Sequence, residues 1–247
     1  MEQRVAESKL YILYIFIAVF SASSSITTGI AWGHWKQTLD QCIGRNCSCI
    51  LYGYHTPTHF LGGDLAPCIW VTFGPLFYLL FIIGLACFHG YRVIFASKNN
   101  VTRTIPSRNA EGEIVEIHAI HKDDTSPLPR TFWIITSAFT AILTLYTLIH
   151  FAIFLDGYLS TCKQYRLMVE KIVGFGGTIL PVIHGRLSCN AIFDFMDYIQ
   201  PDSVTSYRQG YIDTGLDLTL GLIASCSTWV LFLISSLINI GLARQQE

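Results

Sequence analysis

Six of the eight cysteines lie in two parts of the chain, and their thiols offer the clearest chemistry in the sequence. They are Cys42, Cys47, Cys49 and Cys68 in one part and Cys162 and Cys189 in the other. Thiols pair into disulfides in the ER lumen and outside the cell, whereas cytosolic thiols stay reduced. We expect one bridge from Cys47 or Cys49 to Cys68. A second would join Cys162 to Cys189, although six cysteines allow fifteen pairings and the connectivity stays open.

Two histidines near the first cysteine group suggest an alternative, a metal site. His55 and His59 are four residues apart and close to Asp64, and all three belong to zinc-ligand types. Pro57 stands between the histidines and breaks the helix that would bring both to one face. Cysteines in an oxidising compartment also become disulfides rather than ligands. We therefore expect exposed loop histidines and no metal or other cofactor.

No catalytic motif accompanies these residues in the sequence. The Gly-Phe-Gly-Gly run at 174–177 lacks the Gly-Lys-Ser/Thr ending of a phosphate loop. A Gly-x-Ser-x-Gly elbow and a His-Glu-x-x-His helix are both missing. A membrane enzyme would need scattered outer-side residues to converge, namely His55, His59, Asp64 and His184. We predict that the protein is not an enzyme.

Four segments without Asp, Glu, Lys or Arg must position these residues: 10–35, 65–91, 131–155 and 218–243. A helix rises about 1.5 Å per residue, so each segment can cross a hydrocarbon core about 30 Å thick. The chain is 51% hydrophobic and 13% charged, which is too apolar for an ordinary soluble domain. The predicted fold class is an all-α membrane protein, a four-transmembrane-helix bundle with two disulfide-stabilised outer loops.

We expect a single membrane domain over residues 1–247, oriented N-in/C-in. Basic residues are denser in the tails and the middle connection than in the other two connections, which favours this orientation by the positive-inside rule. The middle connection also holds no cysteine. The boundaries are spans at about 10–33, 68–92, 131–155 and 217–243, outer loops at 34–67 and 156–216, and a cytosolic loop at 93–130.

The first span has a second interpretation as a cleavable secretory signal. Lys9, the apolar run 10–20 and the small residues at 21–25 fit that pattern. The uncharged stretch nevertheless continues to Trp35, further than a cleaved peptide needs. We expect the span to be retained.

One glycosylation sequon lies in the first outer loop. Asn46-Cys47-Ser48 makes Asn46 the candidate for a glycan and the chain a candidate glycoprotein. A second sequon begins at Asn100, and in a cytosolic loop it would stay unmodified.

The spans offer little to a transport mechanism. Ionisable residues within a membrane are functional candidates by default, yet no Asp, Glu, Lys or Arg lies near any span's midpoint. His89 and His150 are close in sequence to charged residues, which predicts positions near an interface that water reaches. The alternative of a small channel or transporter would need a water-lined path among Ser21, Ser25, Thr28, Ser225 and Thr228.

Small residues recur every four positions in two spans. Ser21, Ser25 and Gly29 share a face of the first span, and Gly221 and Ser225 repeat the pattern in the fourth. Such small-xxx-small patterns let helix backbones approach closely. We predict that these five residues pack helix against helix within the bundle.

Two shorter predictions concern the connections. The apolar and aromatic stretch 47–54 predicts a short strand, and Gly62-Gly63 predicts a turn. The 93–130 connection mixes both charge signs with prolines, which predicts a solvated segment without stable structure.

Several motifs resemble the transmembrane protein 179 family (179 and 179B). The likeness to that family's Gly-Arg-Cys-x-Leu-Tyr pattern rests on Gly44-Arg45 and Leu51-Tyr52-Gly53 after the first span, then Ala66-Pro67-Cys68 at the second. The third connection is similar in Cys162, Cys189, Tyr207 and Tyr211, followed by Trp229 in the last span. The chain departs from the family by extra residues between Arg45 and Leu51 and by extra cysteines, so the family's bridges could map to Cys47 or Cys49.

This resemblance implies a multi-pass membrane protein that is not an enzyme. With net charge −1, the chain has no basic field that would attract nucleic acid. We expect an accessory, adhesion or trafficking protein of the plasma membrane or a secretory-pathway membrane. Its partners would be the lipid bilayer and a membrane or extracellular protein that contacts the outer loops.

Overall fold

The computed structural model describes residues 3–39, 48–56, 60–95, 103–108, 114–119, 128–174, 188–199 and 212–245. Its main elements are four long helices: α1 (Gln3–His34), α2 (Leu65–Gly90), α3 (Arg130–Gly174) and α6 (Thr214–Gln245). Each is long and apolar enough to span a membrane, as the charge-free segments predicted. Two π-helical turns, η1 (Trp35–Leu39) and η2 (Tyr91–Phe95), extend α1 and α2.

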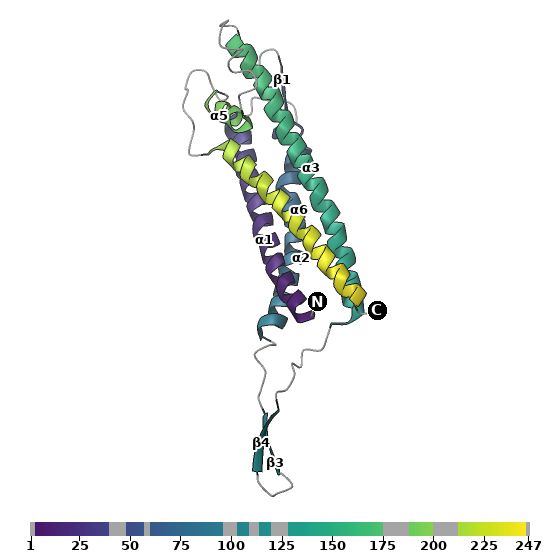
Figure 1. The fold of residues 1–247 in the computed structure, drawn as a ribbon. Helices are drawn as coiled ribbons and strands as arrows, with labels where there is room; N and C mark the ends of the chain where they lie inside the picture. Colours follow the sequence, from purple (N-terminus) through teal and green to yellow (C-terminus); the bar gives the residue numbers. More distant parts are fainter. Residues whose placement is uncertain are drawn as a thin grey trace.

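The four helices form one elongated bundle, in which α1 contacts α2 and α6, and α6 contacts α3 (Figure 1). Both chain termini lie at one end of this bundle. Strand β1 (Cys49–His55) and helix α5 (Cys189–Ile199) lie at the opposite end. The chain therefore crosses the bundle four times and returns to the end where it began.

Small residues set the spacing of α1 and α6. The Ser24 hydroxyl donates to the Gly221 carbonyl oxygen at 3.2 Å. A Cβ on Gly221 would lie 2.9 Å from side-chain atoms of both Thr27 and Thr28, so a larger residue would push the helices apart. Toward α2, the Ser25 hydroxyl donates to the Thr72 carbonyl oxygen at 2.7 Å. Of the other predicted packing residues, Ser21 is fully buried and Gly29 faces Thr72.

Two short hairpins occupy the connections. Strand β1 pairs antiparallel with β2 (Phe60–Gly63), which agrees with the strand predicted at 47–54. Gly62 and Gly63 belong to β2, so the predicted turn is wrong; the carbonyls of Leu51 and Tyr52 leave no room for a side chain at Gly63.

The second hairpin pairs β3 (Arg103–Arg108) with β4 (Ile114–Ala119) in the middle connection. It lies at the end of the bundle that holds the termini (Figure 1). The prediction of a segment without stable structure is wrong for these residues. Both strands contain β-branched residues, which favour extended backbone.

Helix α3 is much longer than the span predicted at 131–155. Its 45 residues correspond to about 67 Å, roughly twice the thickness of a hydrocarbon core. Asp156 ends the uncharged run without ending the helix. Beyond it, Tyr158, Cys162, Tyr165 and Val169 are buried at helical spacing, so packing sustains the additional turns.

The two histidines of the spans are buried, which corrects the prediction that water reaches them. His150 bridges three helices: its Nδ1 lies 3.0 Å from Ser225 Oγ on α6, and its Nε2 lies 3.0 Å from the Val71 carbonyl oxygen on α2. His89 is fully buried between the rings of Tyr14 and Trp133, at centroid distances of 5.8 and 6.1 Å. Proximity to a charge in sequence does not determine whether a helical residue faces inward.

Candidate functional site

The end of the bundle remote from the termini carries a folded cap, which we define as β1, β2, residues 156–171 of α3, and α5. One disulfide joins Cys49 of β1 to Cys68 of α2, and another joins Cys162 of α3 to Cys189 of α5. The prediction of disulfides is confirmed for these four cysteines, with Cys49 as the partner of Cys68. Cys42, Cys47 and the glycosylation candidate Asn46 lie outside the described residues.

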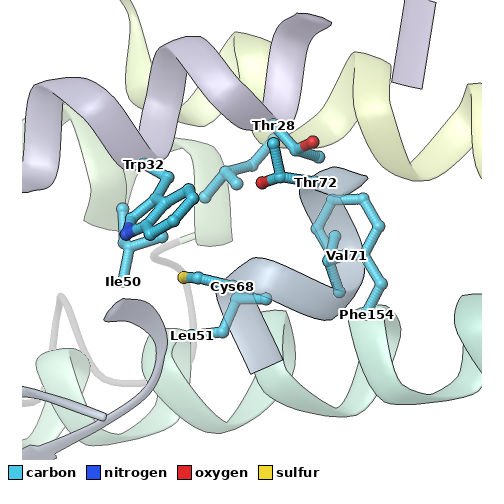
Figure 2. Close-up of a pocket in the computed structure, with 9 residues that line it drawn as sticks. Thr28, Trp32, Ile50, Leu51, Cys68, Val71, Thr72 and Phe154 are labelled. Atoms are coloured by element: carbon cyan, nitrogen blue, oxygen red, sulfur yellow. The ribbon is translucent and has the colours of Figure 1, made fainter. Parts of the chain in front are cut away.

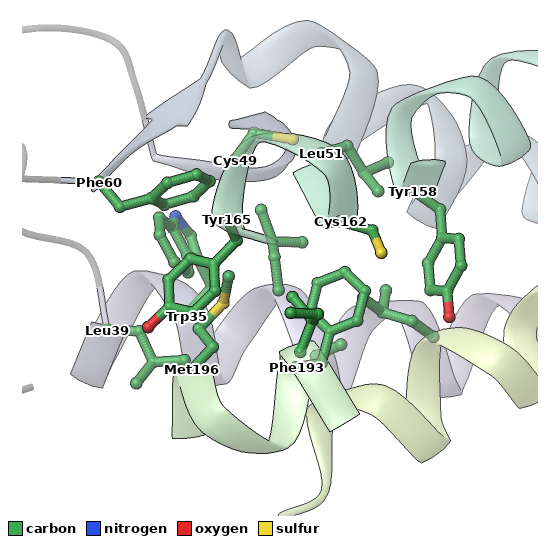
Figure 3. Close-up of a cluster of buried hydrophobic side chains, with 14 of the residues drawn as sticks. Trp35, Leu39, Cys49, Leu51, Phe60, Tyr158, Cys162, Tyr165, Phe193 and Met196 are labelled. Atoms are coloured by element: carbon green, nitrogen blue, oxygen red, sulfur yellow. The ribbon is translucent and has the colours of Figure 1, made fainter. Parts of the chain in front are cut away.

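The cap shares one hydrophobic core with η1 and with the adjoining ends of α1, α2 and α6 (Figure 3). The Phe60 ring of β2 packs edge-on against Trp35 of η1 at 6.1 Å and against Tyr165 of α3 at 5.0 Å. Phe193 and Met196 of α5 are fully buried in the same cluster. Edge-to-face aromatic pairs contribute about 0.5–1.5 kcal/mol beyond their burial. Side chains of β2, α3 and α5 therefore pack in the same core.

Strand β1 is fixed to α3 at a bulge. Tyr52 has a positive φ of 57°, an uncommon conformation for a non-glycine residue, within the irregular register between Cys49 and Tyr54. The backbone on either side of the bulge bonds to Thr161 of α3. Thr161 Oγ1 donates to the Ile50 carbonyl oxygen at 2.8 Å and accepts from the Gly53 N–H at 3.1 Å.

The Tyr52 side chain crosses to α3 as well. Its hydroxyl donates to the Ile153 carbonyl oxygen at 3.2 Å. Partial burial and the nearby Asp156 carboxylate raise the pKa of Tyr52 to about 12, because both disfavour the phenolate. The tyrosine therefore stays a neutral hydrogen-bond donor at physiological pH.

Helix α5 is held to the bundle by a cluster of His34, Asp197 and Thr214. Asp197 Oδ2 accepts from the Thr214 backbone N–H at 2.9 Å, and its Oδ1 accepts from the Thr214 hydroxyl at 2.6 Å. His34 Nε2 lies 3.6 Å from Asp197 Oδ1. The carboxylate thus caps the first turn of α6, where N–H groups lack helical partners. Asp197 is 1% exposed and Thr214 is fully buried, so the cluster is closed to a substrate.

A small void lies where the cap meets the bundle, beneath Trp32, Ile50 and Cys68 (Figure 2). Its volume is about 10 Å³, the space of a single water molecule. Its lining is predominantly apolar, with Thr28 and Thr72 as the polar side chains. This void has no room for a reaction between two molecules.

The outer face of α5 carries exposed aromatic side chains. While α5 buries Ile192, Phe193 and Met196, it leaves Phe195 40% and Tyr198 46% exposed. Beside them, a recess of about 320 Å³ lies between α5 and the start of α6. It is lined by Asn190, Ala191, Asp194, Asp213 and Leu216, so two carboxylate-bearing residues border an aromatic surface. We call Phe195, Tyr198 and this recess the α5 surface.

Of the four residues of the enzyme alternative, the structure describes His55 and Asp64. His55 is half-buried in β1, so the expectation of an exposed loop histidine is wrong for it, and Asp64 is exposed before α2. His59 and His184 lie outside the described residues. Within the described ranges, no three His, Cys, Asp or Glu side chains gather as metal ligands.

The residues that fix the cap escaped sequence analysis. Thr161 and His34 belong to common types with no motif around them, and Tyr52 was singled out only by the family resemblance, which says nothing of its contacts. Asp197 gave a weak signal, since it follows Phe193 by four residues on the apolar face of an amphipathic helix.

Comparison of the chain with family models, with curated proteins and with solved structures finds no match.

Proposed function

We propose that this protein is a non-enzymatic multi-pass membrane protein that binds another membrane or extracellular protein through its cap, as an accessory, adhesion or trafficking component. It would reside in the plasma membrane or a secretory-pathway membrane. The observation that carries the proposal is the α5 surface: exposed aromatic side chains on a unit that two disulfides and an aromatic core hold in shape. The proposal agrees with what the resemblance to the transmembrane protein 179 family implies.

The proposed orientation places both termini in the cytosol. Both described disulfides lie at the end of the bundle opposite the termini. Disulfides persist in the ER lumen and outside the cell, which supports an external cap. Epitope tags at the two termini should therefore be accessible to antibodies only after the plasma membrane is permeabilised.

The composition of the α5 surface indicates the chemistry of its partner. Tyr and Phe are enriched at the centres of protein interfaces, and rigid aromatic side chains there provide much of the binding energy. A preformed cap also avoids the entropy cost of ordering a loop upon binding.

The channel alternative receives no comparable support. Of its five hydroxyl residues, Ser21, Ser25, Thr28 and Thr228 donate to backbone carbonyls, and Ser225 bonds to His150. All five are buried. Their hydrogen-bonding capacity is thus used within the bundle rather than along a water path.

The decisive experiment incorporates a photo-crosslinking amino acid at Phe195 or Tyr198 in cells that express the protein natively. We expect this crosslinker to capture a discrete partner. In protein without the crosslinker, co-purification of that partner through a terminal tag should fall more than about tenfold in the variant Phe195→Glu/Tyr198→Glu. Leu167→Glu is the matched control, because Leu167 is an exposed apolar residue of the cap on α3. Equal co-purification by all variants, or unaided solute flux through the purified protein in liposomes, would overturn the proposal.

A further inference from the structure

A groove runs along the outside of the bundle between α1 and α2, on the half nearer the cap. It is lined by α1 (Ser25, Ile26, Gly29, Ile30, Trp32 and Gly33), by Lys36 of η1, and by α2 (Thr72, Phe73 and Leu76). Its volume is about 630 Å³, within the range of small-molecule sites. From Ser25 to Lys36 the helix rises about 16 Å, which is roughly half of a 30 Å hydrocarbon core. The groove thus has the length of one leaflet.

Two glycines create the hollow on α1. A Cβ added to Gly33 would meet no atom within 4 Å, and one added to Gly29 would only touch Thr72 Cγ2 at 3.4 Å. Gly33 thus leaves open space beside α1, while Gly29 stays in contact with Thr72 of α2. The space is bordered by exposed hydrocarbon: Ile26 is 61% exposed and Phe73 is 52% exposed.

The end of the groove nearest the cap is positively charged rather than apolar. Lys36 is exposed there, and no carboxylate is among the described residues that line the groove. Trp32 lies one turn below, packed edge-on against Phe73 at 6.2 Å, with its indole N–H donating to the Ser48 carbonyl oxygen at 2.9 Å. A tryptophan with a lysine one turn beyond it is the arrangement that anchors a helix at headgroup level.

We propose that this groove binds one phospholipid of the external leaflet, with an acyl chain along Ile26, Gly29 and Gly33 and with the phosphate paired to Lys36. The leaflet assignment rests on the proposed orientation, whereas the binding site does not. A phospholipid matches both parts of the groove, since it joins a hydrocarbon chain to a negatively charged phosphate. A sterol would fill the hollow and leave Lys36 without a charge partner.

Photolabelling of the full-length protein in phosphatidylcholine nanodiscs tests the proposal. The probe is phosphatidylcholine with a diazirine in one acyl chain, and labelled peptides are identified by mass spectrometry. We expect labelling of α1 around Ile26–Gly33 and of α2 around Phe73. Gly33→Phe should reduce it about tenfold by filling the hollow. Gly84→Phe is the matched control, because a Cβ at Gly84 also meets nothing within 4 Å but lies outside the groove.

Lys36→Gln provides a second variant that leaves the bundle intact, since Lys36 is exposed. It should reduce phosphatidylcholine labelling about two- to fivefold, the effect of one exposed ion pair, and leave labelling by a diazirine sterol unchanged. Unchanged labelling in Gly33→Phe would overturn the proposal. So would labelling by the sterol at the same peptides with equal yield, or disulfide-linked dimers of Gly33→Cys, which would identify a second protein helix as the occupant. Failure of the α5 surface to bind a partner would leave these results unaffected.

Discussion

Tyr52 of β1 lies directly against Gly157 of α3. A Cβ on Gly157 would come within 2.9 Å of the Tyr52 ring and 3.0 Å of Leu51 Cβ, so a residue without a side chain is required there. Gly157 directly follows Asp156, where the uncharged run of the third span ends. Packing of β1 against α3 at Gly157 helps to stabilise the helix beyond that point, because the next turns of α3 contact the bulge of β1.

The variant Gly157→Ala should therefore destabilise the cap by about 1–3 kcal/mol, the usual cost of overpacking. Hydrogen exchange of the β1 amides, measured by mass spectrometry in nanodiscs, would detect it as faster local opening. Gly84→Ala is the control, because its Cβ meets nothing within 4 Å and alanine is the better helix former by up to about 1 kcal/mol. Equal exchange in both variants would mean that the Tyr52–Gly157 contact does not hold β1.

The raised pKa of Tyr52 predicts a pH dependence of cap stability. The folded pKa of about 12 lies above the ordinary value of 10.0, so the stabilisation is complete below pH 10 and is lost as pH rises toward 12. An ultraviolet difference titration between the wild type and Tyr52→Phe should show one tyrosinate with a midpoint near 12. A midpoint near 10 would show that the phenol is neither buried nor close to Asp156.

The four spans could be predicted because their signal is local. A charge-free run of sufficient length identifies a membrane helix whatever surrounds it. The extension of α3 past Asp156 could not, because β1 and α5, distant in sequence, sustain it. The water access of His150 was predicted wrongly for a related reason. Its distance in sequence from a charged residue indicates how deep it lies in the membrane, whereas its burial depends on which helices cover its face of α3.

The cap was predictable in its chemistry and not in its geometry. Cysteine counts and compartment chemistry predicted disulfides, but choosing between Cys47 and Cys49 for Cys68 requires the register of β1 on β2. The burial of Asp197 likewise depends on Thr214, which is 17 residues away in sequence, and no local sequence pattern predicts that the two residues meet. Only a three-dimensional structure brings these pairs together.

Removing the bridge between α3 and α5 should loosen α5 selectively. Cys162→Ala/Cys189→Ala opens a closed segment with a sequence separation of 27, and such bridges contribute about 2–4 kcal/mol. We expect protease cleavage within α5 to become faster, while cleavage within β1 stays unchanged. The reciprocal variant Cys49→Ala/Cys68→Ala should expose β1 and spare α5. Faster cleavage everywhere in both variants would instead mean that the cap unfolds as one cooperative unit.

Substitution of Asp197, whose carboxylate accepts two hydrogen bonds from Thr214 at the start of α6, tests how α5 is held to the bundle. Asp197→Asn preserves the size of the side chain but removes the charge and one acceptor from two short hydrogen bonds with Thr214. Leaving a buried donor without its partner costs about 1–3 kcal/mol, so α5 and the first turn of α6 should exchange hydrogen about five- to a hundredfold faster. Asp64→Asn is the control, since Asp64 is exposed, its side chain makes no cap hydrogen bond to α2, and the substitution should cost less than about 0.5 kcal/mol. If the two variants exchange alike, the orientation of α5 must come from its apolar face alone, and Phe195 and Tyr198 would keep their positions without this carboxylate.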